Sequence, residues 1–149
     1  MKLTYTKIET DRTGSPPFSR QQIADFLFHQ LEQYGDKKHA IVKCIGYAYG
    51  DRPGQDGFVL VAHQKSEILG AVIMNQTNMG DYIPDNILVY IAVHAKTRGL
   101  GIGKELMKQV IKLSRGDIAL HVEPDNPARY LYEKLGFTNK YLEMRLLKK

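Results

Sequence analysis

The chain contains a single cysteine, Cys44, and no apolar run long enough to cross a bilayer. One cysteine cannot form a disulfide within the chain. Residues 1–7 also lack the apolar stretch of a signal peptide. We therefore expect a protein that does not associate with membranes and works in the reducing environment of the cytoplasm.

Linkers, internal repeats and low-complexity segments are likewise absent from the 149 residues. A chain of this length buries roughly two thirds of its unfolded surface, enough for one hydrophobic core. We therefore expect one domain that spans residues 1–149.

The sequence shows no basic cluster interleaved with aromatic residues and no helix-turn-helix or RNA-binding motif. Its formal net charge of +5 favours an anionic ligand and equally permits weak, nonspecific contact with nucleic acid. We expect no specific nucleic-acid partner, and we expect no metal site.

Glycine is concentrated in residues 98–104, which read RGLGIGK. An apolar strand is predicted before them, over residues 87–93, and a helix after them, where Leu106, Val110 and Leu113 recur at helical spacing. The unpaired N–H groups of a helix N-terminus bind anions, and glycine lets a phosphate approach them. Because each glycine in a helix costs about 1 kcal/mol, three of them indicate that the site requires an accessible backbone.

Two common glycine motifs do not fit this segment. A Walker loop would need glycine at Arg98 and a hydroxyl residue at Glu105. Counted from Gly99, a dinucleotide fingerprint would need its third glycine one residue later than Gly103. Counted from Gly101, the motif would end at Leu106. Neither nucleotide-binding class is favoured.

A second ordered segment comprises residues 126–137, which read NPARYLYEKLGF. Local helix chemistry accounts for much of it: Asn126 can cap a helix, Pro127 suits the first helical position, and Gly136 can end it in a left-handed conformation. Local chemistry gives no comparable reason for Tyr132.

Both segments resemble signatures of the GCN5-related N-acetyltransferase (GNAT) family. Residues 93–103 match the pattern V-x-P-x-x-R-G-x-G-I-G, except that Ala95 replaces the frequent proline. Residues 126–137 resemble N-x-x-A-x-x-L-Y-x-K-x-G-F at nearly every fixed position, with Asn126 two residues before the alanine instead of three. The resemblance implies direct transfer of acetyl from acetyl-CoA to a primary amine of a small molecule or peptide. The alternative is a non-catalytic sensor or regulatory domain that binds acetyl-CoA.

The element order predicted from sequence is β, α, β, β, β, α, β, α, β. Strands are expected over residues 3–8, 58–63, 68–74, 87–93 and 118–122, and residues 137–147 supply one or two final antiparallel strands. The first helix is expected to begin at a capping box in residues 19–22 and to stop at Gly35. Residues 36–56 are either helix or strand. The resemblance implies an α/β fold with a mixed, splayed sheet and helices on both faces.

The resemblance also implies a set of cofactor-binding residues. Ile91, Ala92 and Val93 would bond the pantetheine arm and the acetyl carbonyl through the main chain. The pyrophosphate would lie on Arg98, Gly99, Leu100, Gly101, Ile102, Gly103 and Lys104. Asn126 and Arg129 would touch the cofactor.

For catalysis, the resemblance implies that Tyr132 protonates the departing thiolate. The amine arrives protonated and must lose a proton before it attacks, and Glu123 is our first choice of base because it follows the fifth strand. Asp85, Tyr90, His94 and His121 remain alternatives. The oligomeric state stays open, with a homodimer through the final strands as one alternative.

Overall fold

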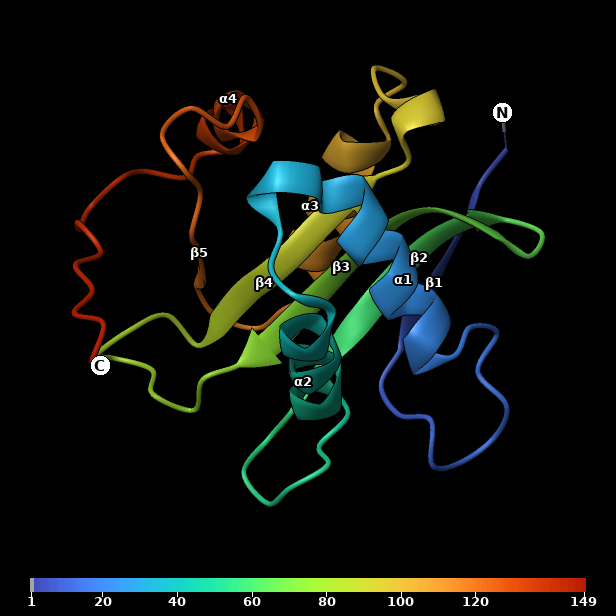
Figure 1. Ribbon diagram of the computed structural model, residues 1–149, viewed down its shortest axis with the longest axis horizontal. Coiled ribbons are helices and arrows are strands. Elements are labelled where there is room, and N and C mark those ends of the chain that lie inside the picture. Colours follow the sequence, from blue (N-terminus) through green and yellow to red (C-terminus); the bar gives the residue numbers. More distant parts are fainter. Residues whose placement is uncertain (1) are drawn as a thin grey trace.

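The computed structural model describes residues 2–149 and shows a five-stranded sheet with helices packed on both of its faces (Figure 1). The strands are β1 (Thr4–Ile8), β2 (Gly57–Gln64), β3 (Glu67–Gln76), β4 (Asn86–Val93) and β5 (Ile118–Leu120). The helices are α1 (Arg20–Leu31), α2 (Lys38–Ala48), α3 (Ile102–Leu113) and α4 (Ala128–Lys134), with short 3-10 turns η1 (Glu32–Tyr34) and η2 (Ala95–Thr97).

The strands lie in the order β1-β2-β3-β4-β5. The first four pair antiparallel, whereas β5 pairs parallel to β4, so the predicted mixed α/β sheet is confirmed. The pairing of β4 with β5 is short and runs only from Asn86 opposite Ile118 to Leu88 opposite Leu120. Beyond Leu88 the two strands separate, which is the splay expected from the sequence.

A β-bulge in β4 marks the point of separation. On β3, Met74 pairs with Leu88 and Ile73 pairs with Tyr90, so Val89 is the extra residue on β4. A bulge bends its strand and increases the local twist. The bend comes directly after the last pair with β5 and therefore accounts for the gap between the two strands.

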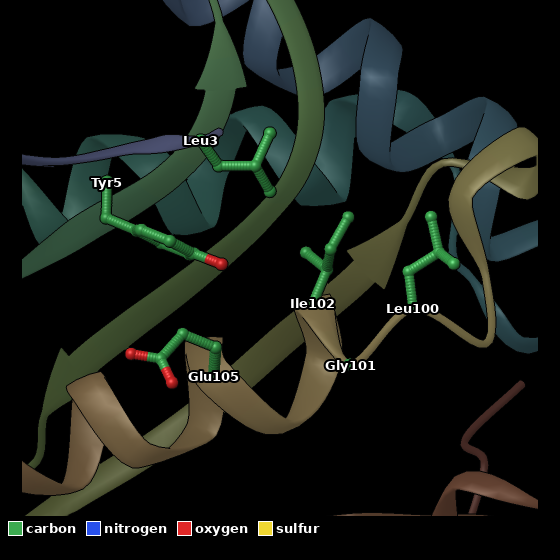
Figure 2. Close-up of a pocket in the computed structure, with 6 residues that line it drawn as sticks. All are labelled: Leu3, Tyr5, Leu100, Gly101, Ile102 and Glu105. Atoms are coloured by element: carbon green, nitrogen blue, oxygen red, sulfur yellow. The ribbon is translucent and has the colours of Figure 1, made fainter. Parts of the chain in front are cut away.

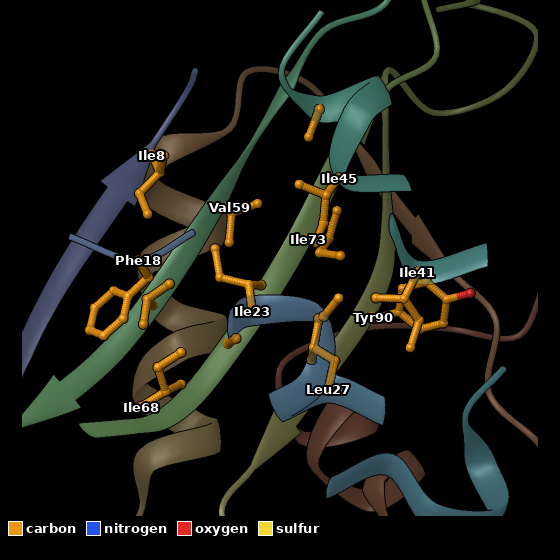
Figure 3. Close-up of a cluster of buried hydrophobic side chains, with 14 of the residues drawn as sticks. Ile8, Phe18, Ile23, Leu27, Ile41, Ile45, Val59, Ile68, Ile73 and Tyr90 are labelled. Carbon is orange, nitrogen blue, oxygen red and sulfur yellow. The ribbon is translucent and has the colours of Figure 1, made fainter. Parts of the chain in front are cut away.

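Helices α1 and α2 cover one face of the sheet. Their buried side chains, Ile23, Leu27, Ile41 and Ile45, pack with Ile8, Val59, Val61, Ile73 and Tyr90 from the strands (Figure 3). Helix α2 lies within residues 36–56, so the open choice between helix and strand is settled as helix.

Helices α3 and α4 cover the opposite face. Ile102 and Leu106 pack above Gly70 of β3, where an added Cβ would lie 2.8 Å from Leu106 Cδ1. The bare backbone at Gly70 therefore lets the start of α3 lie close against the sheet. Tyr132 of α4 belongs to the same buried cluster.

The predicted helix ends are confirmed with one shift. Ser19 Oγ accepts a bond from the Gln22 N–H and Gln22 Oε1 accepts one from the Ser19 N–H, which is the expected capping box. Asn126 Oδ1 accepts a bond from the Ala128 N–H, so it caps α4, although the helix begins one residue later than expected. Gly136 has φ +103° and ends α4 as predicted.

An ion-pair cluster ties the start of α1 to two loops. The Arg20 guanidinium contacts Asp11 at 2.5 Å and Asp51 at 2.6 Å. Hydrogen bonds from Arg20 lower the pKa of both carboxyl groups. The cluster holds the loop before α1 against the loop after α2.

Two strand predictions are wrong and are corrected by the structure. Residues 138–149 form neither helix nor strand, so the final antiparallel strands predicted within residues 137–147 are not present. A strand needs a neighbour for its backbone groups, and Figure 1 shows this stretch running apart from β5 after α4. The fifth strand ends at Leu120 rather than Val122, because β4 has already turned away at that level.

Candidate active site

The gap between β4 and β5 opens into a cleft of about 600 Å³. Most of the predicted cofactor residues line it: Ile91, Ala92, Val93, Arg98, Gly99, Gly101, Ile102, Gly103, Lys104 and Asn126. They come from β4, from the glycine segment with the start of α3, and from the segment before α4. The splay thus brings together residues that are up to 35 positions apart in the chain.

Unpaired backbone of β4 forms one wall of the cleft. The His94 N–H donates to the Leu69 carbonyl at 2.8 Å, so the peptide groups of His94 point toward β3. Because peptide groups alternate in direction along a strand, those of Ile91 and Val93 point the other way, into the gap. The Val93 carbonyl accepts a bond from Arg98 Nε at 3.2 Å. The remaining groups are free to bond an extended ligand.

The glycine segment forms the second wall, and the backbone conformation of two of its residues requires glycine. Gly99 and Gly101 have φ of +84° and +85°, and a Cβ added at either would meet no atom within 4 Å. Left-handed geometry, rather than crowding, therefore selects glycine here. No side chain of residues 2–149 caps α3 at Gly101, and the first residues of the helix, Ile102 to Lys104, line the cleft.

The Arg98 side chain is engaged with the protein itself. Its guanidinium donates to the Gln30 carbonyl at 2.8 Å as well as to Val93, and it lies 3.9 Å from Glu32. Carbonyl groups at the end of α1 carry partial negative charge and favour a cation there. Arg98 thus ties the glycine segment to the end of α1.

Tyr132 lines the cleft and is 7% exposed. Its ring centre is 6.0 Å from that of Phe137. Burial raises the pKa of Tyr132 to about 12, because the phenolate would be poorly solvated. The hydroxyl therefore keeps its proton at neutral pH and can donate it.

Three predicted site residues lie outside the cleft lining. Leu100 borders a smaller cavity of about 250 Å³ beside Tyr5 and Glu105 (Figure 2). Arg129 is exposed on α4 and pairs with Glu133 at 3.5 Å.

Glu123, the predicted base, is the third of these residues. It is exposed in the connection between β5 and α4, where its carbonyl accepts a bond from the Asn126 N–H. Among the alternatives, Tyr90 lies on the face covered by α1 and α2 and donates its hydroxyl to Asp36 at 2.6 Å. Neither side chain borders the cleft.

The structure adds a third wall that the sequence analysis missed. Gln30, Leu31, Glu32 and Tyr34, from the end of α1 and from η1, also line the cleft. The Tyr34 hydroxyl lies 3.4 Å from the Asp125 carbonyl in the connection before α4. No local pattern marks these residues, because only the approach of α1 to the gap brings them there.

Residues 2–149 contain neither a metal-binding cluster nor a helix that could span a membrane. No group of three or more His, Cys, Asp or Glu side chains is arranged to hold a metal ion. None of the helices combines the length and apolar character that a membrane crossing requires.

Residues 55–139 match the family model described as an acetyltransferase (GNAT) domain. This match covers more than half of the sequence, and the chain belongs to the GNAT family. It includes β4, the glycine segment and α4, which line the cleft, but not the wall formed by the end of α1 and η1.

One curated relative is a 5-NmdU N-acetyltransferase from Pseudomonas phage PaMx11, 32% identical over 84 residues. The alignment spans 55% of this chain and 58% of the relative.

Solved structures share the fold over nearly the whole chain. A ribosomal-protein-alanine N-acetyltransferase from Brucella melitensis has a TM-score of 0.66 at 16% identity, covering 99% of this chain and 100% of its own. A predicted acetyltransferase from Clostridium acetobutylicum, solved with acetyl-CoA, has a TM-score of 0.65 at 14% identity, covering 97% of this chain and 96% of its own. At these identities the likeness shows the fold alone.

Proposed function

We propose that this protein is an acetyl-CoA-dependent N-acetyltransferase. One observation carries the proposal: a single cleft combines an unpaired stretch of β4, an uncapped glycine-rich helix start and a buried, protonated tyrosine. Membership of the GNAT family and the N-acetyltransferase relative support it. The fold neighbour that was solved with acetyl-CoA supports the choice of acetyl donor.

The cleft residues fit the parts of acetyl-CoA one by one. The outward peptide groups of Ile91 and Val93 suit the amides of the pantetheine arm, which would extend along β4 in place of a neighbouring strand. The N–H groups at the start of α3 suit the pyrophosphate. A cleft volume of about 600 Å³ is in the range typical of small-molecule sites.

The reaction exchanges one bond for another. The amine nitrogen bonds to the acetyl carbon as the bond from that carbon to sulfur breaks. A backbone N–H of β4 stabilises negative charge on the acetyl oxygen. Tyr132 then gives its proton to the thiolate, which leaves as the free thiol.

A base must remove a proton from the ammonium form of the amine before the amine attacks. Glu123 remains our first candidate, acting through water because its side chain lies outside the cleft lining. Glu32 is the acidic side chain that does border the cleft, and it competes for the role.

The acceptor is proposed only as a primary amine of a small molecule or peptide. The phage relative is described as an N-acetyltransferase, which supports a nitrogen acceptor. The walls contributed by η1 and by the segment before α4 belong to this chain's own cleft, and their shape will select among amines. The cytoplasmic location remains a prediction.

The test measures binding and turnover separately. Calorimetry with acetyl-CoA should show saturable binding, and thiol release should rise when members of an amine panel are added. Absence of binding by the folded protein would refute the proposal. Binding without thiol release for any amine would instead support the sensor alternative.

Tyr132→Phe tests the proton donor. We expect acetyl-CoA binding to persist and turnover to fall by about a hundredfold or more, the usual effect of losing a general acid. Tyr130→Phe is the matched control, because Tyr130 lies on the same helix but is 68% exposed. Equal turnover in both variants would remove Tyr132 from the mechanism.

A further inference from the structure

The Arg98 side chain reaches from the glycine segment to the end of α1. Its Nη2 donates to the Gln30 carbonyl at 2.8 Å, its Nε donates to the Val93 carbonyl at 3.2 Å, and its Nη1 lies 3.9 Å from Glu32 Oε1. All three guanidinium nitrogens thus lie beside protein oxygen atoms. A phosphate group that approached this side chain would compete with the two carbonyl groups and with the negative charge of Glu32.

A second contact joins the same two segments. The Ala95 N–H donates to Gln30 Oε1 at 2.8 Å. Gln30 is therefore bonded twice, by the first residue of η2 and by the residue that follows η2. Hydrogen bonds from a charged group are stronger than those between neutral groups, so the bond from Arg98 is the stronger of the two.

Packing does not fix the part of the third wall that follows α1. None of the residues of η1 is buried. Glu32, which joins α1 to η1, has φ +52° and ψ −124°, a strained conformation for a residue with a side chain. Such strain persists only where the surrounding structure holds the backbone in place. The contacts of Arg98 lie at this strained link and at Gln30, two residues before it.

We propose that the Arg98 side chain is a positioning residue that holds the third wall of the cleft, rather than a ligand of the acetyl-CoA pyrophosphate. This inference rests on the proposed function, in which acetyl-CoA occupies β4 and the start of α3 and leaves the third wall to the amine. Without the Arg98 contacts, the strained link relaxes and moves Glu32 and Tyr34 away from the amine. Arg98 therefore acts on amine binding through η1.

Arg98→Lys separates the two roles, because lysine keeps the positive charge but lacks the planar fork of donors. Kinetics use the amine of the panel that gives the fastest thiol release. We expect its KM to rise about tenfold or more, the usual effect of losing a hydrogen bond from a charged group. The Kd for acetyl-CoA should change by less than about threefold. An unchanged KM would overturn the proposal.

Arg98→Met and Lys96→Met form a matched pair, since each removes one positive charge close to the glycine segment. Lys96 lies in η2 and pairs with Glu67 instead of α1, and both side chains are exposed, so neither change should unfold the chain. The two variants should bind acetyl-CoA equally within about threefold, and only Arg98→Met should raise the KM for the amine. A Kd for acetyl-CoA that is about tenfold or more higher in Arg98→Met than in Lys96→Met would refute the proposal.

Amide hydrogen exchange of the free protein gives a measurement that needs no turnover. Amides of residues 32–35 should exchange about tenfold faster or more in Arg98→Met than in Lys96→Met, because η1 opens when the link is released. If no amine supports thiol release in the parent, the proposed function fails, yet this comparison still tests whether Arg98 holds the third wall. Equal exchange in the two variants would show that other contacts hold η1, which also refutes the proposal.

Discussion

Gly101 provides the sharpest test of the anion site, through a pair of substitutions that differ only in charge. Gly101→Gln and Gly101→Glu place side chains of nearly equal size at the start of α3. Both must adopt φ near +85°, which costs an L-residue about 1–2 kcal/mol. This strain lowers the free energy of unfolding equally in the two variants, so the difference between them reports charge alone.

The size of that difference follows from the position of Gly101 on the surface of the cleft. A carboxylate about 5 Å from one phosphate charge is repelled by about 1 kcal/mol in water and by about 3 kcal/mol at an effective dielectric constant near 20. Gly101→Glu should therefore bind acetyl-CoA about 5-fold to 150-fold more weakly than Gly101→Gln. Added salt should reduce the gap, because it screens exposed charges.

Calorimetric titration with acetyl-CoA at low and high salt measures both effects. Gly54 supplies the control pair, since it also has φ +85°, has no atom within 4 Å of an added Cβ, and lies in the loop between α2 and β2. Gly54→Gln and Gly54→Glu should bind equally. Equal affinity of the two Gly101 variants would show that the pyrophosphate does not lie on the start of α3.

Three further predictions concern proton transfer, packing and acid stability. Comparing pH–rate profiles of Glu123→Gln and Glu32→Gln identifies the base: the variant that loses the lower-pH limb carries that role, and two unchanged profiles exclude both residues. Leu106→Ala should lower the free energy of unfolding by about 2–5 kcal/mol, since Leu106 is 0% exposed. Gly70→Ala should lower the free energy of unfolding less in Leu106→Ala than in the parent, because in the parent the added Cβ would lie 2.8 Å from Leu106 Cδ1. Denaturant titrations of the parent, the two single variants and the double variant give the coupling energy. Arg20→Met should abolish part of the stability present above about pH 4: the two carboxyl groups that Arg20 contacts have lowered pKa values, so their contribution is lost as pH falls through those values. A difference in the free energy of unfolding between parent and variant that stays constant from pH 7 to pH 3 would contradict this prediction.

Local sequence patterns were sufficient to predict the helix ends and strands that depend only on neighbouring residues. The capping box at Ser19, the strand before the glycines and the left-handed glycine at Gly136 all lie where the patterns predicted them. Each depends on neighbours within a few residues, so the chain specifies it before any distant contact forms. The spacing of Gly99 and Gly101 likewise predicted the uncapped start of α3.

Tertiary structure decided what depends on residues far apart in the chain. Glu32 and Tyr34 border the cleft only because α1 ends beside the gap, and the gap exists only because Val89 bulges where β4 leaves β5. Residues 141–147 have a strand pattern, yet a strand forms only where another backbone accepts its hydrogen bonds. Periodicity describes which face of a segment is apolar, whereas pairing and cleft walls depend on which distant backbone lies beside it.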